Sequence, residues 1–107
     1  MPAHESLSGI QFNYIEPGMH SSGHHLTAHD TEGRHLGGME WDARKIRSID
    51  VNPDVRRQGV GTALWNQGHA LAAENARVPA PKHSDDRTAA GDAWARSVGG
   101  RLPRRRK

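Results

Sequence analysis

The sequence lacks cysteine and is poor in large apolar side chains. Its 107 residues include no Cys, three Trp, one Tyr and one Phe, and only 34% of them are hydrophobic. The absence of Cys excludes disulfides, thiolate metal sites and a Cys nucleophile. A chain of this length and composition predicts one domain with a modest core, so we expect some apolar side chains to be buried at a subunit interface.

Two further features are absent from the chain. No apolar run is long enough to span a bilayer, so no membrane association is expected. Residues 1–9, MPAHESLSG, have neither the basic start nor the apolar stretch of a secretory signal. We therefore expect a soluble, cytoplasmic protein.

Positive charge is concentrated at the C-terminus. Residues 101–107, RLPRRRK, hold five of the 15 Lys and Arg residues, whereas the other ten face all 12 Asp and Glu. This distribution predicts a single domain over residues 1–100 followed by a basic tail over 101–107. Such a tail can contact nucleic-acid phosphates, or it can be a solubilising terminus.

The first half of the chain has the alternating pattern of a β-sheet. In residues 10–15, Ile10, Phe12 and Tyr14 would share one face, while Gln11 and Asn13 point to the other. The sequence Asp-Thr-Glu-Gly at 30–33 predicts a hairpin turn in which Gly33 takes a positive φ. Strands are expected over residues 10–15, 24–29, 35–41 and 45–51.

The second half has helical periodicity. Apolar or small residues recur at helical spacing between Gly59 and about Arg77. A short strand is expected over 82–84, followed by a second helix that begins at Ser84 or Asp85 and ends at Gly99. The prediction is an α+β fold with a mixed or antiparallel sheet and two main helices.

The stretch VNPDVRRQGVGTALW, residues 51–65, combines glycines, two arginines and a helix start. Together these features favour an anionic ligand such as a phosphate group, because the backbone amides and the helix N-terminus attract negative charge. A Walker A loop is excluded because no Lys follows Gly61. A dinucleotide-binding fingerprint fits poorly because Leu64 stands at its third glycine and residues 53–58 separate the loop from the strand.

The segment Arg56–Gly61 fits the pattern R/Q-x-x-G-x-G/A between a strand and a helix. It resembles motif A of the GNAT superfamily of acetyl-CoA-dependent N-acetyltransferases, and the resemblance extends over roughly residues 24–102. It implies a minimal GNAT-like fold, acetyl-CoA as co-substrate and transfer of the acetyl group to an amine-bearing acceptor. The cofactor-binding residues that it implies are Ile49, Val51, Arg56, Arg57, Gln58, Gly59, Val60, Gly61, Thr62 and Ser84.

The chain departs from the GNAT pattern in two places. Only EPGMHSSG, residues 16–23, replaces the helices that usually follow the first strand, and Ala95 aligns with the tyrosine that often protonates the leaving thiolate. Glu40 and Asp50 are candidate general bases on strands near the expected acetyl group. The alternative is a catalytically inactive GNAT-like protein acting as a binding or structural module, including one associated with a phage.

Eight histidines raise the question of a metal site, and unmatched apolar residues raise that of a dimer. His25 and His29 would lie about 13 Å apart along one strand, which is too far for one ion, so no metal is predicted. The helices expected on one sheet face leave Ile15 or Trp41 without cover. We therefore predict a homodimer that buries one of these side chains.

Overall fold

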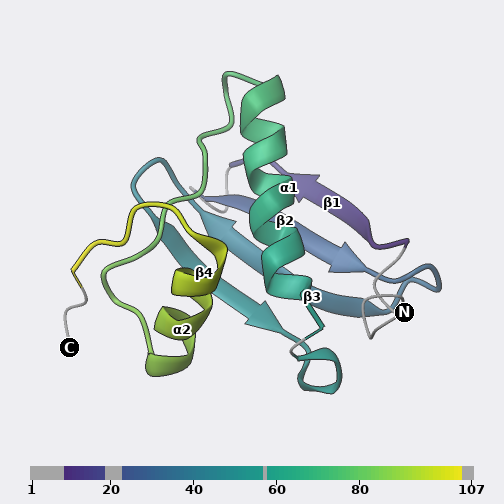
Figure 1. The fold of residues 1–107 in the computed structure, drawn as a ribbon. Helices are drawn as coiled ribbons and strands as arrows, with labels where there is room; N and C mark the ends of the chain where they lie inside the picture. Colours follow the sequence, from purple (N-terminus) through teal and green to yellow (C-terminus); the bar gives the residue numbers. More distant parts are fainter. Residues whose placement is uncertain (1–8, 19–22, 57, 105–107) are drawn as a thin grey trace.

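The computed structural model describes residues 9–18, 23–56 and 58–104, and it has the predicted α+β class. Four strands form one sheet in the order β1-β2-β3-β4, with every neighbouring pair antiparallel. Figure 1 shows α1 crossing one face of this sheet, with α2 on the same side beside β4. The bounds are β1 Gln11–Ile15, β2 His24–His29, β3 His35–Trp41, β4 Ile46–Val51, the 3-10 helix η2 Pro53–Val55, α1 Val60–Glu74 and α2 Ala89–Val98.

The hairpin between β2 and β3 forms as predicted. Gly33 has a φ of 87° and its N–H donates to the carbonyl of Asp30 at 3.0 Å. The carboxylate of Asp30 also accepts from the N–H groups of Glu32 and Arg34. The turn is therefore held by one aspartate and by a glycine in a conformation that side chains disfavour.

The core lies between α1 and the sheet face beneath it. Met39 and Trp41 from β3 are 2% and 0% exposed, and Leu64 from α1 is 0% exposed. Gly68 allows close contact here, since a Cβ atom on it would lie 3.0 Å from the Met39 Cε atom. The predicted helical stripe is confirmed: Val60, Leu64 and Gly68 are buried, and Leu71 and Ala72 are partly buried.

The alternation in β1 is also confirmed. Phe12 and Tyr14 are partly buried against the core, whereas Gln11, Asn13 and Ile15 are exposed on the opposite face. Among the described elements, both helices lie on the core side of the sheet (Figure 1). The other face carries mainly polar side chains, as expected for a half-solvated antiparallel sheet.

Three local predictions were wrong. Residues 82–84 form no strand, although the Ile46 N–H donates to the Lys82 carbonyl at 2.7 Å. The second helix begins at Ala89, because the Thr88 side chain caps it by accepting from the Gly91 N–H. Ser84 instead accepts the Asp86 N–H, so its hydroxyl stabilises a turn before the helix.

The third wrong prediction concerns the end of the first helix, which lies at Glu74 rather than near Arg77.

Trp41 is covered within its own chain, which overturns its predicted place at a dimer interface. Its side chain is 0% exposed and its indole N–H donates to the Pro79 carbonyl at 2.7 Å. The His24 ring stacks on it with centroids 5.6 Å apart. Ile15 remains available for contact, since it is 51% exposed.

Candidate functional site

A groove of about 1080 Å³ runs along the outer edge of β4. Strand β4 forms one wall, the loop before α1 and the first turn of that helix form one end, and residues 83–97 form the other wall. Ligand pockets in proteins have volumes of roughly 300–1000 Å³, so the groove can hold a molecule of cofactor size. It is the candidate functional site.

The β4 wall presents backbone hydrogen-bonding groups to the groove. The Asn52 N–H donates to the Leu36 carbonyl at 2.8 Å, and the register pairs Asp50 with Gly38. Residues in an antiparallel ladder alternate between bonding the neighbouring strand and facing away from it. The N–H and C=O groups of Ile49 and Val51 therefore face away from β3, toward the groove.

The end of the groove is the N-terminus of α1. Gly59 is the N-cap residue, with a φ of 88°, and it makes no side-chain capping bond. The N–H groups in the first turn of a helix have no partner within the helix, and they lie at the positive end of its dipole. Arg56 is exposed beside this turn and also lines the groove. This end of the groove therefore has the properties of an anion-binding site.

Gly37 brings the first turn of α1 close to the sheet. A Cβ atom at Gly37 would lie 2.6 Å from the Asp50 carbonyl oxygen and 3.1 Å from the Val60 Cγ1 atom. Because glycine has no Cβ, the Val60 side chain can pack directly over β3, where it is 1% exposed. The spacing between β4 and the helix start thus depends on a glycine in the neighbouring strand.

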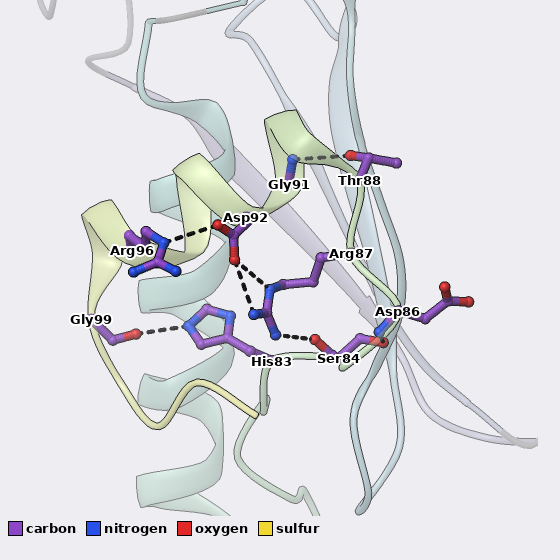
Figure 2. A network of polar contacts seen from close by, with 9 residues as sticks. All are labelled: His83, Ser84, Asp86, Arg87, Thr88, Gly91, Asp92, Arg96 and Gly99. Carbon is purple, nitrogen blue, oxygen red and sulfur yellow. Dashed lines mark hydrogen bonds and ion pairs between the residues drawn. The ribbon is translucent and has the colours of Figure 1, made fainter. Parts of the chain in front are cut away.

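A polar network fixes the wall opposite β4, as Figure 2 shows. The Arg87 guanidinium donates through Nη1 to the Ser84 carbonyl and through Nε and Nη2 to the Asp92 carboxylate, at 3.1 and 2.9 Å. Arg96 donates to the other carboxylate oxygen of Asp92 at 2.9 Å. These bonds from Arg96 and Arg87 lower the pKa of Asp92 below its ordinary value. The network ties the segment before α2 to the helix itself.

Aromatic packing supports the same wall from beneath. His83 is 3% exposed, stacks on Trp65 with centroids 4.2 Å apart, and its Nε2 atom lies 2.7 Å from the Gly99 carbonyl oxygen. Trp94 meets both rings edge-on and lines the groove. Its Nε1 atom would be 3.0 Å from a Cβ atom at Gly61. Trp94 therefore connects α2 to the start of α1.

The structure brings most of the predicted binding residues together. Gln58 is not among the lining residues, and Arg57 lies outside the described residues. Those that line the one groove are Ile49, Val51, Arg56, Gly59, Val60, Gly61, Thr62 and Ser84.

The two candidate bases share one face of the sheet but lie on different strands, because the register pairs Gly38 with Asp50 on the edge strand β4 and Glu40 of β3 with Ser48. Asp50 lines the groove, with a side chain that is 73% exposed and lies 3.8 Å from His35. Glu40 does not line it: its carboxylate lies 3.7 Å from His25 and 3.8 Å from Arg47, on the sheet face opposite α1. Only Asp50 of the two is therefore placed to act on a ligand in the groove.

The residues that line the groove include no tyrosine. Ala95, the position at which the resemblance to GNAT proteins would place a tyrosine, is 0% exposed in the core. The hydroxyl of Tyr14 lies 2.6 Å from the His24 Nδ1 atom, on the strand at the other side of the sheet. Tyr14 is therefore not placed to donate a proton to a ligand in the groove.

Sequence reasoning missed several residues of the α2 wall. Arg87, Thr88, Trp94 and Ser97 all line the groove. The expected helix start at Ser84 or Asp85 hid the turn that carries Arg87, and the helical pattern did not mark Trp94 as a groove residue. Thr88 followed by an Asp four residues later was an available signal for the true helix start, because both favour a helix N-terminus.

Comparisons with known proteins yielded no relatives. No protein-family model, curated protein or solved structure matches the chain. Over the described residues, no cluster of three or more potential ligands could hold a metal ion. None of the helices described has both the length and the apolar character needed to cross a membrane.

Proposed function

We propose that the groove binds an acyl-CoA, with acetyl-CoA as the first candidate, and that the chain transfers the acyl group to an amine. One observation carries this proposal: an uncovered strand edge and an uncapped helix N-terminus open into the same groove. The strand edge can pair with an extended chain that carries amide groups, and the helix N-terminus can bind a pyrophosphate. Coenzyme A contains both groups in one molecule. The resemblance of Arg56–Gly61 to GNAT motif A supports the same ligand.

The ligand would lie along β4 in a defined direction. The pantetheine amides would pair with the backbone groups of Ile49 and Val51, as an added strand pairs with a sheet edge. The pyrophosphate would accept from the first-turn amides that follow Gly59, with Arg56 adding positive charge. Ser84, on the opposite wall, would contact the pantetheine arm.

The chemistry requires one proton transfer from the acceptor. The amine nitrogen forms a bond to the acyl carbon, the thioester C–S bond breaks, and the amine proton finally resides on the CoA sulfur. Asp50 is the candidate base because it is the predicted carboxylate that lines the groove, and it would act directly or through water. The products are an amide and free CoA thiol.

A second candidate function is binding without turnover. An alanine at position 95 and the placement of Tyr14 on β1, at the other edge of the sheet, favour it, because neither residue can protonate a thiolate in the groove. On this alternative the groove would hold CoA, or a related phosphate ester, as a structural or regulatory ligand. The two functions predict the same binding and different turnover.

Calorimetry with CoA and acetyl-CoA, followed by a thiol-release assay over a panel of amines, tests both functions. Arg56→Glu should weaken CoA binding at least tenfold, because it reverses a charge beside the helix N-terminus. Arg77→Glu is the matched control: it makes the same change at an exposed position beyond the other end of α1. Binding with thiol release supports the transferase, and binding without release supports the second function. Equal CoA affinity in the two variants would contradict the groove assignment.

Gly61 is a poor site for the same test, although it lies at the centre of the motif. A Cβ atom there would approach the Trp94 Nε1 atom at 3.0 Å. Any side chain at this position must therefore displace Trp94, and a loss of binding would mix steric and electrostatic causes. Arg56 is exposed, so its replacement changes charge with little change in packing.

A further inference from the structure

Strand β1 forms the edge of the sheet farthest from the groove. Over the described residues it pairs only with β2. Its sequence, QFNYI, contains no charged residue and no proline. Proteins usually protect an edge strand with such residues, because its unpaired amide groups attract other strands. The edge of β1 therefore has the composition of a strand that pairs further.

The sheet's hydrogen-bond alternation identifies which groups face outward from β1. Asp50 and Gly38 form a hydrogen-bonded pair, so Met39 bonds β2 and Thr27 bonds β1. Asn13, the partner of Thr27, consequently faces β2. The N–H and C=O groups of Phe12 and Tyr14 face outward, away from the sheet.

The side chains of β1 are incompletely covered on both faces. Phe12 and Tyr14 pack against the core from the border of the sheet and are only partly buried. Helix α1 packs mainly on β2, β3 and β4. On the opposite face, Ile15 is 51% exposed. A further strand beside β1 would cover apolar surface on both sides at once.

We propose that β1 pairs antiparallel with β1 of a second copy of this chain, around a two-fold axis that passes between the two Asn13 residues. In this register Phe12 lies opposite Tyr14 of the second copy, and Gln11 lies opposite Ile15. All five residues of each strand are paired, and the outward amides of Phe12 and Tyr14 bond each other. The product is one continuous sheet of eight strands.

Three features favour a second copy over a different partner. The register is self-complementary, as a two-fold interface requires. It places no like charges opposite each other, because the strand is neutral and Glu16 falls opposite Ile10. It also sets aromatic side chains opposite each other on the core side, a stabilising cross-strand pair. Other in-phase registers leave strand residues unpaired.

The absence of cysteine allows a test that reads the register directly. Single-cysteine variants Asn13→Cys, Gln11→Cys and Ile15→Cys place one thiol each on the exposed face of β1. In the proposed dimer of Asn13→Cys, the two introduced thiols are direct neighbours at a non-hydrogen-bonded pair, within reach of a disulfide after small adjustment. Two thiols at position 11, or two at position 15, are roughly 13 Å apart.

Of the three single variants, only Asn13→Cys should therefore form a disulfide-linked dimer on mild oxidation, and most of its molecules should do so. Gln11→Cys and Ile15→Cys should stay uncrosslinked separately and should form a mixed disulfide when combined. Sedimentation equilibrium of the parent, at micromolar concentration, should give twice the chain mass of 11.8 kDa. A parent that sediments as a monomer would overturn the proposal. So would equal crosslinking of all three variants, each shown by circular dichroism to be folded.

Discussion

Replacing Trp41 should destabilise the monomer itself, in contrast to the interface role that its sequence position suggested. The indole is 0% exposed beneath α1, and its N–H donates to the Pro79 carbonyl at 2.7 Å. It thereby anchors the segment that leads to Lys82 and His83, at the start of the groove's second wall. The loss of Trp41 should affect both the core and the groove.

The expected magnitudes follow from this burial. Truncation of a buried Trp to Ala costs about 3–5 kcal/mol. A domain of this size has a total stability of about 5–15 kcal/mol, so Trp41→Ala should leave a marginal fold. Trp41→Phe keeps an aromatic ring but leaves the Pro79 carbonyl without its donor, at a cost of about 1–3 kcal/mol. Trp41→Glu would bury a charge without a partner and should prevent folding.

Urea denaturation followed by far-ultraviolet circular dichroism measures this series without depending on tryptophan fluorescence. The expected order of stability is parent, then Trp41→Phe, then Trp41→Ala, with Trp41→Glu unfolded in the absence of urea. Isolation of Trp41→Glu as a folded monomer with parental stability would refute the placement of this side chain in the core.

Three further outcomes are expected. Gly68→Ala should lower the free energy of unfolding, because the added methyl group would lie 2.6 Å from the Pro81 Cγ atom. Overpacking costs about 1–3 kcal/mol, which exceeds the gain in helix propensity of about 0.5–1 kcal/mol. The midpoint of urea denaturation measures the change. Burial lowers the pKa of His24 and His69 below their ordinary value of 6.5. At these two histidines the folded chain therefore binds fewer protons than the unfolded chain, and the melting temperature should fall as the pH drops below about 6.5. The fall should be smaller in His24→Gln and in His69→Gln, because each variant lacks one of the two groups. Replacing residues 104–107 with serine should leave CoA binding unchanged and make any nucleic-acid binding less salt-dependent; a loss of CoA affinity would place the tail in the site.

Local sequence patterns predicted much of the fold. The alternation of Phe12 and Tyr14 with polar neighbours gave β1 its face, and Gly33 gave the hairpin its turn. The change to helical spacing after Gly59 gave the start of α1. Each of these signals depends on residues close together in the chain, which is why sequence alone could reveal them.

The errors occurred where distant contacts decide the structure. Trp41 resembled an exposed strand residue until its bond to Pro79, 38 residues away, placed it in the core. Residues 82–84 have a strand-like position, but only the Lys82 carbonyl reaches β4, so no ladder forms. Glu40 and Asp50 were equivalent in sequence, and only the strand order, with β4 at the edge and β3 inside the sheet, shows that Asp50 alone of the two borders the groove. The hydrogen bonds of Arg87 likewise join the turn at Ser84 to Asp92 in α2, and the spacing of these residues in the sequence did not reveal that contact.

The central claim is that a CoA chain lies along the edge of β4 and pairs with its backbone. The pair Ile49→Pro and Ile49→Ala tests it most directly. Both variants remove the Ile49 side chain, but proline also removes the N–H that faces the groove, a change that an edge strand tolerates.

Isothermal titration with CoA, on variants matched for folding by circular dichroism, is the decisive measurement. Ile49→Ala should bind within a few-fold of the parent, and Ile49→Pro should bind at least tenfold more weakly, as the loss of a ligand hydrogen bond together with altered edge geometry predicts. Equal CoA affinity in the two folded variants, or no CoA binding by the parent, would contradict the account.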